Sequence, residues 1–154
     1  MGELPQRKLL PHGIPPWVEP GSVFFITICG EPRGVNQFCL PDVSKSLFDS
    51  VGVYEKQQKW WVRLLVLMPD HLHALIAFPR NVSMKDTVVK WKHFHANRTG
   101  IRWQRDFFDH RLRKEESLQE KGEYIRKNPV RARLVNNESA WPYILDKMRT
   151  ICAE

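Results

Sequence analysis

The feature that most constrains the fold is a pair of apolar segments separated by a tight turn. Residues 60–68 (WWVRLLVLM) are apolar on both faces of an extended chain, and residues 71–78 (HLHALIAF) follow after Pro69 and Asp70. A strand that is apolar on both faces is typical of the centre of a sheet, and proline and aspartate are common turn residues. We therefore predict a central antiparallel hairpin made of these two segments.

The segments around this hairpin show strand and helix patterns. Residues 23–29 (VFFITIC) are β-branched and aromatic, which favours a strand. A short return strand is predicted at residues 37–40, and residues 103–112 have strand character. Apolar residues recur at helical spacing in three further segments, at about residues 42–58, 83–97 and 114–127. The last helix is expected to stop at Asn128, because proline at the next position disfavours helix in the residue before it.

The predicted order is strand, helix, strand, strand, helix, strand, helix. The first six elements are those of a ferredoxin-like α+β sandwich, in which helices cover one face of an antiparallel sheet, and the seventh is an appended C-terminal helix. A length of 154 residues suits one domain. We divide the chain into an extended, basic, proline-rich arm (residues 1–20), one folded domain (21–136) and a C-terminal tail (137–154).

The charge of the chain indicates a polyanionic partner. Lysine and arginine number 24 against 17 aspartate and glutamate, a net charge of +7. A solvated basic surface explains the total equally well, but many cations lie in the last third and alternate with aromatic residues, which suits phosphates beside unstacked bases. The candidate DNA contacts are Arg7 and Lys8 in the arm, which a disordered tail explains equally well, and Arg105, Arg111, Arg113, Lys121, Arg126, Lys127 and Arg131.

No segment predicts a membrane span or a secretory signal. The longest apolar run has nine residues and includes Arg63, which is too short and too polar to cross a bilayer. The first residues lack the apolar core of a signal peptide. Cys29, Cys39 and Cys152 have no metal-binding spacing, and their odd number fits a reduced protein. We expect a cytoplasmic protein with no membrane partner.

Two histidine pairs have the same spacing in different predicted elements. His71 and His73 lie on a strand, so both imidazoles should share one face, with Cα atoms roughly 7 Å apart, and can reach one divalent ion. Two inert polar residues at a hairpin end are the alternative. His93 and His95 lie on a predicted helix, where residues two apart do not face each other. We interpret that second pair as surface or packing residues.

Tyr124 and Asn128 are four residues apart, on one face of the last predicted helix. The phenol is a candidate nucleophile, and the amide oxygen is a candidate third metal ligand. A packed tyrosine and an asparagine at a helix end are the alternative. Lys121, Arg126 and Lys127 surround Tyr124 with positive charge, which stabilises a phenolate and attracts phosphate.

These motifs together resemble those of one family. MPDHLHALI resembles the HUH motif (His–hydrophobic–His) of single-tyrosine transposases, and WQRDFFDHRLR followed by YIRKNPVRARLV is similar to the REP-associated tyrosine transposases, over roughly residues 20–136. The resemblance implies a ferredoxin-like fold and a divalent metal, Mg²⁺ or Mn²⁺, held by His71, His73 and Asn128. It implies Tyr124, on the appended helix, as the catalytic nucleophile. One difference is Arg133, where relatives often carry glycine.

The resemblance further implies nicking and strand transfer of single-stranded DNA through a 5′-phosphotyrosine, at hairpin-forming repeats. We expect a monomer or a homodimer. Two histidines would also accept Zn²⁺. Three alternatives stay open: a replication initiator or relaxase-like nickase with the same chemistry, a domesticated single-stranded nucleic-acid-binding protein without catalysis, and a metal hydrolase that uses bound water.

Overall fold

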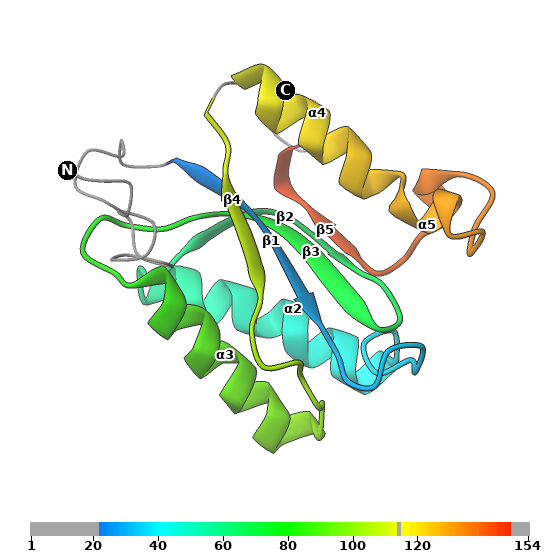
Figure 1. The fold of residues 1–154 in the computed structure, drawn as a ribbon, viewed down its shortest axis with the longest axis horizontal. Coiled ribbons are helices and arrows are strands. Elements are labelled where there is room, and N and C mark those ends of the chain that lie inside the picture. Colours follow the sequence, from blue (N-terminus) through cyan, green and yellow to red (C-terminus); the bar gives the residue numbers. More distant parts are fainter. Residues whose placement is uncertain (1–21, 114, 149–154) are drawn as a thin grey trace.

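The predicted hairpin forms the centre of a five-stranded antiparallel sheet with the order β4-β1-β3-β2-β5 (Figure 1). The structure is a computed structural model, in which residues 22–113 and 115–148 are described. The strands are β1 (Val23–Cys29), β2 (Trp61–Leu67), β3 (His71–Ala77), β4 (Phe108–Arg111) and β5 (Ile144–Asp146). β3 pairs with β2 on one side and with β1 on the other, so it is the middle strand.

Helices cover both faces of this sheet (Figure 1). α2 (Pro41–Lys56) and α3 (Met84–Thr99) pack on one face. α4 (Glu115–Arg126), followed by the short helix α5 (Asn128–Arg131), lies across the other face. The predicted α+β sandwich with an appended helix is therefore confirmed. Within the described residues, no helix combines the length and apolarity that crossing a bilayer requires.

Two separate hydrophobic cores follow from the alternation of side chains along the strands. Ile26 and Leu72 belong to the core beneath α2 and α3. Phe25 and Leu75 belong to the second core, beneath α4. Because side chains in a strand alternate between faces, every odd-numbered residue of β1 and β3 is directed to the α4 side. This alternation decides which polar side chains of the sheet can meet α4.

The segment at residues 37–40 differs from its prediction, because it forms no strand. Its Phe38 ring is fully buried in the core beneath α2 and α3. The backbone N–H groups of Gln37 and Phe38 both donate to the carbonyl oxygen of Pro69, at 2.8 and 3.2 Å. The segment therefore packs against the turn between β2 and β3 and fixes its position.

Two further differences concern the edges of the sheet. The strand expected over residues 103–112 is shorter, because Trp103 forms only an isolated bridge with Gly30 and regular pairing begins at β4. The segment 137–154, predicted only as a tail, contributes β5, which pairs with β2 and was missed. A three-residue strand is too short to carry a recognisable pattern of its own.

Candidate active site

His71 and His73 lie at the start of β3, on the face covered by α4. Leu72 between them is buried on the opposite face, in the core beneath α2 and α3. The two imidazoles meet edge to face, with ring centroids 4.8 Å apart. The placement predicted for the two rings, together on one face of a strand, is confirmed.

The carboxylate of Asp70 determines which nitrogen of His71 carries the proton. His71 Nδ1 lies 2.8 Å from Asp70 Oδ1. Burial raises the pKa of Asp70, but hydrogen bonds from Arg33, His71 and the Gly34 N–H outweigh it and bring that pKa well below its usual range. Because an ionised carboxylate only accepts, His71 Nδ1 is the protonated nitrogen, and Nε2 keeps its lone pair. The sequence identified Asp70 only as a turn residue.

His73 is held by β1, the neighbouring strand. Its Nδ1 lies 2.9 Å from the hydroxyl oxygen of Thr27, its partner in the strand register. Its ring stacks on Phe25 with centroids 5.5 Å apart. Burial first, and nearby positive charges second, lower the pKa of His73 to about 3. The imidazole is therefore neutral at physiological pH, which is the form that binds metals.

α4 and α5 bring Tyr124 to this same face of the sheet. Lys121 bridges the two layers, because its Nζ lies 4.9 Å from the centre of the Phe25 ring and 5.4 Å from that of Tyr124. Lys121 and Arg131 are among the charges that lower the pKa of His73. The Tyr124 side chain is half exposed, at 50%. A tyrosine that packs in a core would be covered, so its phenol is accessible to a substrate.

Arg131 links Tyr124 with Asn128. Its guanidinium carbon lies 4.1 Å from the centre of the Tyr124 ring, a cation–π contact. Its Nη2 donates to the backbone oxygen of Tyr124 at 2.7 Å and to Asn128 Oδ1 at 3.2 Å. A carbonyl oxygen has two lone pairs, so the amide oxygen keeps a second acceptor position. The predicted nucleophile and the predicted third ligand are therefore neighbours.

The helix does not simply end at Asn128. α4 ends at Arg126, and Asn128 begins α5 with Pro129 in its first turn, where a missing N–H costs no hydrogen bond. The Lys127 N–H donates to the Glu123 carbonyl, and the Arg131 N–H donates to the Lys127 carbonyl. Helical spacing therefore continues across the break, which keeps Tyr124 and Asn128 on one side.

The chemical types of His71, His73 and Asn128 would suit a divalent ion. Among the described residues, no group of three or more His, Cys, Asp or Glu side chains could hold a metal. A site at His71 and His73 therefore needs a ligand of another type, and Asn128 is the residue predicted for it. A carboxylate on Nδ1 of His71 is the outer-shell contact usual for a metal-binding histidine. Two imidazoles and an amide oxygen form a mixed nitrogen and oxygen set that Mg²⁺, Mn²⁺ and Zn²⁺ can each accept.

Comparison with known proteins gives relatives of one kind. No protein-family model matches the chain. It is 29% identical over 96 residues to a Haemophilus influenzae protein provisionally named REP-associated tyrosine transposase, covering 51% of this chain and 54% of the relative. It is 25% identical over 126 residues to the REP-associated tyrosine transposase of Escherichia coli, covering 80% and 75%. The match thus spans about half the length of the first relative.

Solved structures with the same fold complete the comparison. One, described as a REP-associated tyrosine transposase bound to a REP hairpin, has a TM-score of 0.74 at 19% identity and covers 92% of this chain and 85% of the other. The chain resembles the REP-associated tyrosine transposases in sequence and in fold. A provisionally named transposase from Deinococcus radiodurans has a TM-score of 0.52 at 17% identity, covering 74% of this chain and 95% of the other. The resemblance that the motifs predict is confirmed.

Arg133, the position at which this sequence differs from the REP-associated tyrosine transposases, lies in a left-handed turn after α5. Arg133 has a φ of 61°, in the left-handed region that glycine adopts freely. For another residue this backbone conformation costs roughly 1–2 kcal/mol. The turn after α5 is kept, because the Arg133 N–H donates to Val130 and the Leu134 N–H to Pro129.

The predicted DNA contacts fall in different parts of the molecule. Lys121 on α4 and Arg131 on α5 contact the Tyr124 ring, and Lys127 lies between the two helices. Arg111 pairs with Phe24 in the register of β4, so its side chain is directed to the α2 and α3 side. Arg105 and Arg113 are exposed on either side of β4. Arg7 and Lys8 lie outside the described residues.

The prediction that Arg126 contacts DNA is wrong, because its side chain is buried in the structure. Its side chain is only 4% exposed, and its guanidinium donates two hydrogen bonds to the Asp146 carboxylate, at 2.7 and 3.2 Å. This pair fastens α4 to β5, and the guanidinium is not available to a phosphate. Among the residues of α4 whose burial the structure describes, Leu118, Gly122 and Ile125 are also buried, so helical spacing already placed Arg126 on the packed side.

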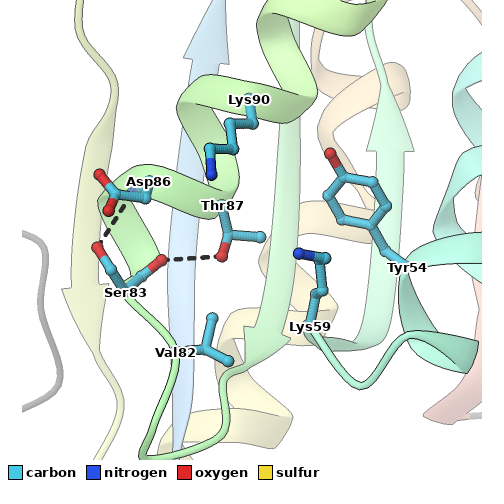
Figure 2. A pocket seen from close by; sticks show the side chains of 7 residues that line it. All are labelled: Tyr54, Lys59, Val82, Ser83, Asp86, Thr87 and Lys90. Carbon is cyan, nitrogen blue, oxygen red and sulfur yellow. Dashed lines mark hydrogen bonds between the residues drawn. The ribbon is translucent and has the colours of Figure 1, made fainter.

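A cavity of about 190 Å³ lies away from this site, between the end of α2 and the start of α3 (Figure 2). Polar groups at its wall are already engaged, since Ser83 Oγ accepts from the Asp86 N–H at 3.1 Å and the Thr87 hydroxyl donates to the Ser83 carbonyl at 2.8 Å. It is lined by Tyr54, Lys59, Val82, Ser83, Asp86, Thr87 and Lys90. That lining has no histidine and lies on the α2 and α3 side, so the candidate site remains the one on the α4 side of the sheet.

Proposed function

We propose that this chain nicks single-stranded DNA and transfers strands through a covalent 5′-phosphotyrosine at Tyr124, on DNA that forms hairpin repeats. The names of the relatives, and a solved relative described as bound to a REP hairpin, support this substrate. The observation that carries the proposal is that an exposed tyrosine lies on the same side of the sheet as two facing imidazoles. Lys121 and Arg131 contact the Tyr124 ring, and their charges also lower the pKa of His73.

The cations around Tyr124 would bind the DNA backbone. Lys121 and Arg131 flank the phenol ring, and Lys127 is exposed between α4 and α5. Each phosphate contact releases counterions, so affinity should fall steeply with salt. Unpaired bases are the part of a hairpin substrate that a duplex does not offer, so a perfect duplex of the same sequence should bind more weakly.

His71, His73 and Asn128 would hold the divalent ion. When bound, that ion would supply Lewis-acid stabilisation of the charge on the scissile phosphate. Asp70 keeps Nδ1 of His71 protonated, so that Nε2 is directed to the site as a lone-pair donor. Thr27 orients His73 in the same way when Nδ1 donates to its hydroxyl oxygen. These outer contacts fix both rings before substrate arrives.

Tyr124 would attack the phosphorus atom in line with the leaving oxygen. A bond forms between the phenol oxygen and phosphorus, the bond from phosphorus to the 3′ oxygen breaks, and the proton lost by the phenol ends on the freed 3′-hydroxyl. Lys121 and Arg131, which lie against the Tyr124 ring, would place positive charge beside the phosphate that it attacks. Because a phosphodiester is exchanged for a phosphotyrosine ester, another 3′-hydroxyl can reverse the step and join strands.

Cleavage of a labelled hairpin oligonucleotide by wild type and Tyr124→Phe tests the proposal. With Mg²⁺ or Mn²⁺, the wild type should give a protein–DNA adduct on a denaturing gel. Tyr124→Phe removes one oxygen and should bind DNA normally in a gel shift while cleavage disappears. A hydrolase that uses bound water would keep cleaving after the substitution, and a protein that only binds DNA would cleave in neither form. Either result rejects the covalent mechanism.

A further inference from the structure

Phe108 is an exposed aromatic residue on the face that carries the histidines. It is the first residue of β4, at the edge of the sheet, and its side chain is 54% exposed. Thr27 is the register partner of both Phe108 and His73, one on each side of β1. Side chains of directly paired residues lie on one face, so His73, Thr27 and Phe108 form one row. Two strand spacings, about 10 Å, separate the ends of that row.

A chain of ring contacts connects Phe108 with the site. Its ring meets Phe25 edge on, with centroids 5.9 Å apart. Phe25 in turn stacks on His73 at 5.5 Å and lies beneath Lys121 Nζ at 4.9 Å. Packing therefore sets the position of the Phe108 ring, although half of its surface remains open to solvent. Lys121 Nζ in turn contacts both the Phe25 ring and the Tyr124 ring.

We propose that Phe108 is a base-stacking subsite, on which an unpaired base of the single-stranded DNA lies close to the scissile phosphate. This inference rests on the proposed function and names one contact of the substrate. Ring faces beside cations are the usual means of binding single strands, because every base offers a π face. Phe108 is only about 10 Å along this row from His73, so the stacked base should lie within about three nucleotides of the phosphate that Tyr124 attacks.

A base fits this position better than a protein side chain does. The chain carries a net charge of +7, and Lys121 on α4 lies over the Phe25 ring that contacts Phe108. An anionic backbone is complementary to this surface, and a base attached to it is delivered to the ring without the cost of a new interface. A single exposed ring is also too small a patch for a stable protein interface.

Fluorescence anisotropy with a hairpin oligonucleotide that has a single-stranded flank tests the subsite. All variants are made in the full chain with Tyr124→Phe, so that cleavage does not alter the substrate. Phe108→Ala and Phe108→Leu should both weaken binding about 5- to 100-fold, the range expected when one stacked base is removed. Phe108→Trp should restore affinity to within about threefold. Phe94→Ala is the matched control, since Phe94 is 47% exposed on α3, on the opposite side of the sheet, and should bind as the parent does.

Abasic substitutions in the flank, one position at a time, identify the stacked base. One position should weaken binding of the parent, and the same position should have no further effect in Phe108→Ala. Equal effects at every position, or unchanged affinity of Phe108→Ala, would overturn the subsite. Base-dependent loss in a protein that never cleaves would support the subsite and reject only the proposed catalysis. Normal cleavage by the chain with Tyr124 intact, together with unchanged binding of Phe108→Ala, would reject the subsite alone.

Discussion

The two histidine pairs of this chain have the same spacing, and the fold uses them in opposite ways. On β3, His71 and His73 share one face, with ring centroids 4.8 Å apart. On α3, His93 is exposed and His95 is fully buried. A strand repeats every two residues and a helix every 3.6. The secondary structure beneath the motif therefore decides whether two histidines can reach one ligand.

The two histidine pairs also differ in the hydrogen bonds that their rings make. Ser50 donates its hydroxyl proton to the Leu47 carbonyl at 2.7 Å, so its oxygen must accept from His95 Nε2 at 2.9 Å. That nitrogen therefore carries a proton and cannot bind a metal. His71 is the reverse, because Asp70 holds the proton on Nδ1 and leaves Nε2 with its lone pair. A His-x-His motif thus needs both a strand and suitable outer contacts.

Loss of one facing imidazole should have the largest effect. His71→Ala should lower cleavage and Mn²⁺ affinity by more than about 100-fold, since even outer-shell partners of metal ligands contribute 10- to 100-fold. His93→Ala is the matched control and should change neither. Calorimetric titration with Mn²⁺ and the oligonucleotide assay measure the two effects. Normal Mn²⁺ binding by His71→Ala would break the contrast between the pairs.

His95 should matter for stability and not for metal binding. It contacts the Trp91 ring, with centroids 4.9 Å apart, and its Nε2 bonds to the buried Ser50. His95→Ala leaves a cavity and removes the hydrogen bond to Ser50, so we expect a loss of about 2–4 kcal/mol in the free energy of unfolding. Urea denaturation measures it. Weakened Mn²⁺ binding by a folded His95→Ala protein would contradict the division of roles.

The buried His95 also makes stability depend on pH. Burial, followed by the charge of Arg98, lowers the pKa of His95 from 6.5 to about 4. Below pH 6.5 His95 binds a proton in the unfolded chain but stays neutral in the folded chain. The free energy of unfolding should therefore fall as pH decreases from 6.5 towards 4. His73 acts in the same direction. In His95→Gln the unfolding free energy should change less over this window, and an identical pH profile would show that His95 has no part in it.

Substitution of Arg131 should have the smallest effect, and it should change the affinities for Mn²⁺ and for DNA in opposite directions. Its guanidinium donates to Asn128 Oδ1 and brings positive charge to the proposed metal site. Arg131→Gln removes that charge, so Mn²⁺ affinity should rise roughly 3- to 10-fold, while DNA affinity falls by a similar factor because one phosphate no longer has a cationic partner. Calorimetry and gel shift measure both. A fall in Mn²⁺ affinity would mean that Arg131 positions the amide and does not compete for it.

The sequence predicted what depends on local periodicity. The central hairpin, α3 and the common face of His71 and His73 follow from patterns within a few residues. Contacts between distant segments could not be predicted in this way. The charge of Asp70 depends on Arg33, 37 residues away, and the burial of Arg126 depends on Asp146, 20 residues away. A residue type predicts its chemistry, but its partner decides whether that chemistry is available.

The point at which DNA becomes attached to the protein tests the central claim most directly. After incubation with hairpin DNA and Mg²⁺ or Mn²⁺, nuclease and trypsin digestion followed by mass spectrometry should find a nucleotide 5′-phosphate on the peptide of residues 122–126, which contains Tyr124. The same modification should be missing in His71→Ala and present in His93→Ala. Attachment at Tyr54 or Tyr143, or cleavage without any attached peptide, would contradict the assignment of Tyr124 as the nucleophile.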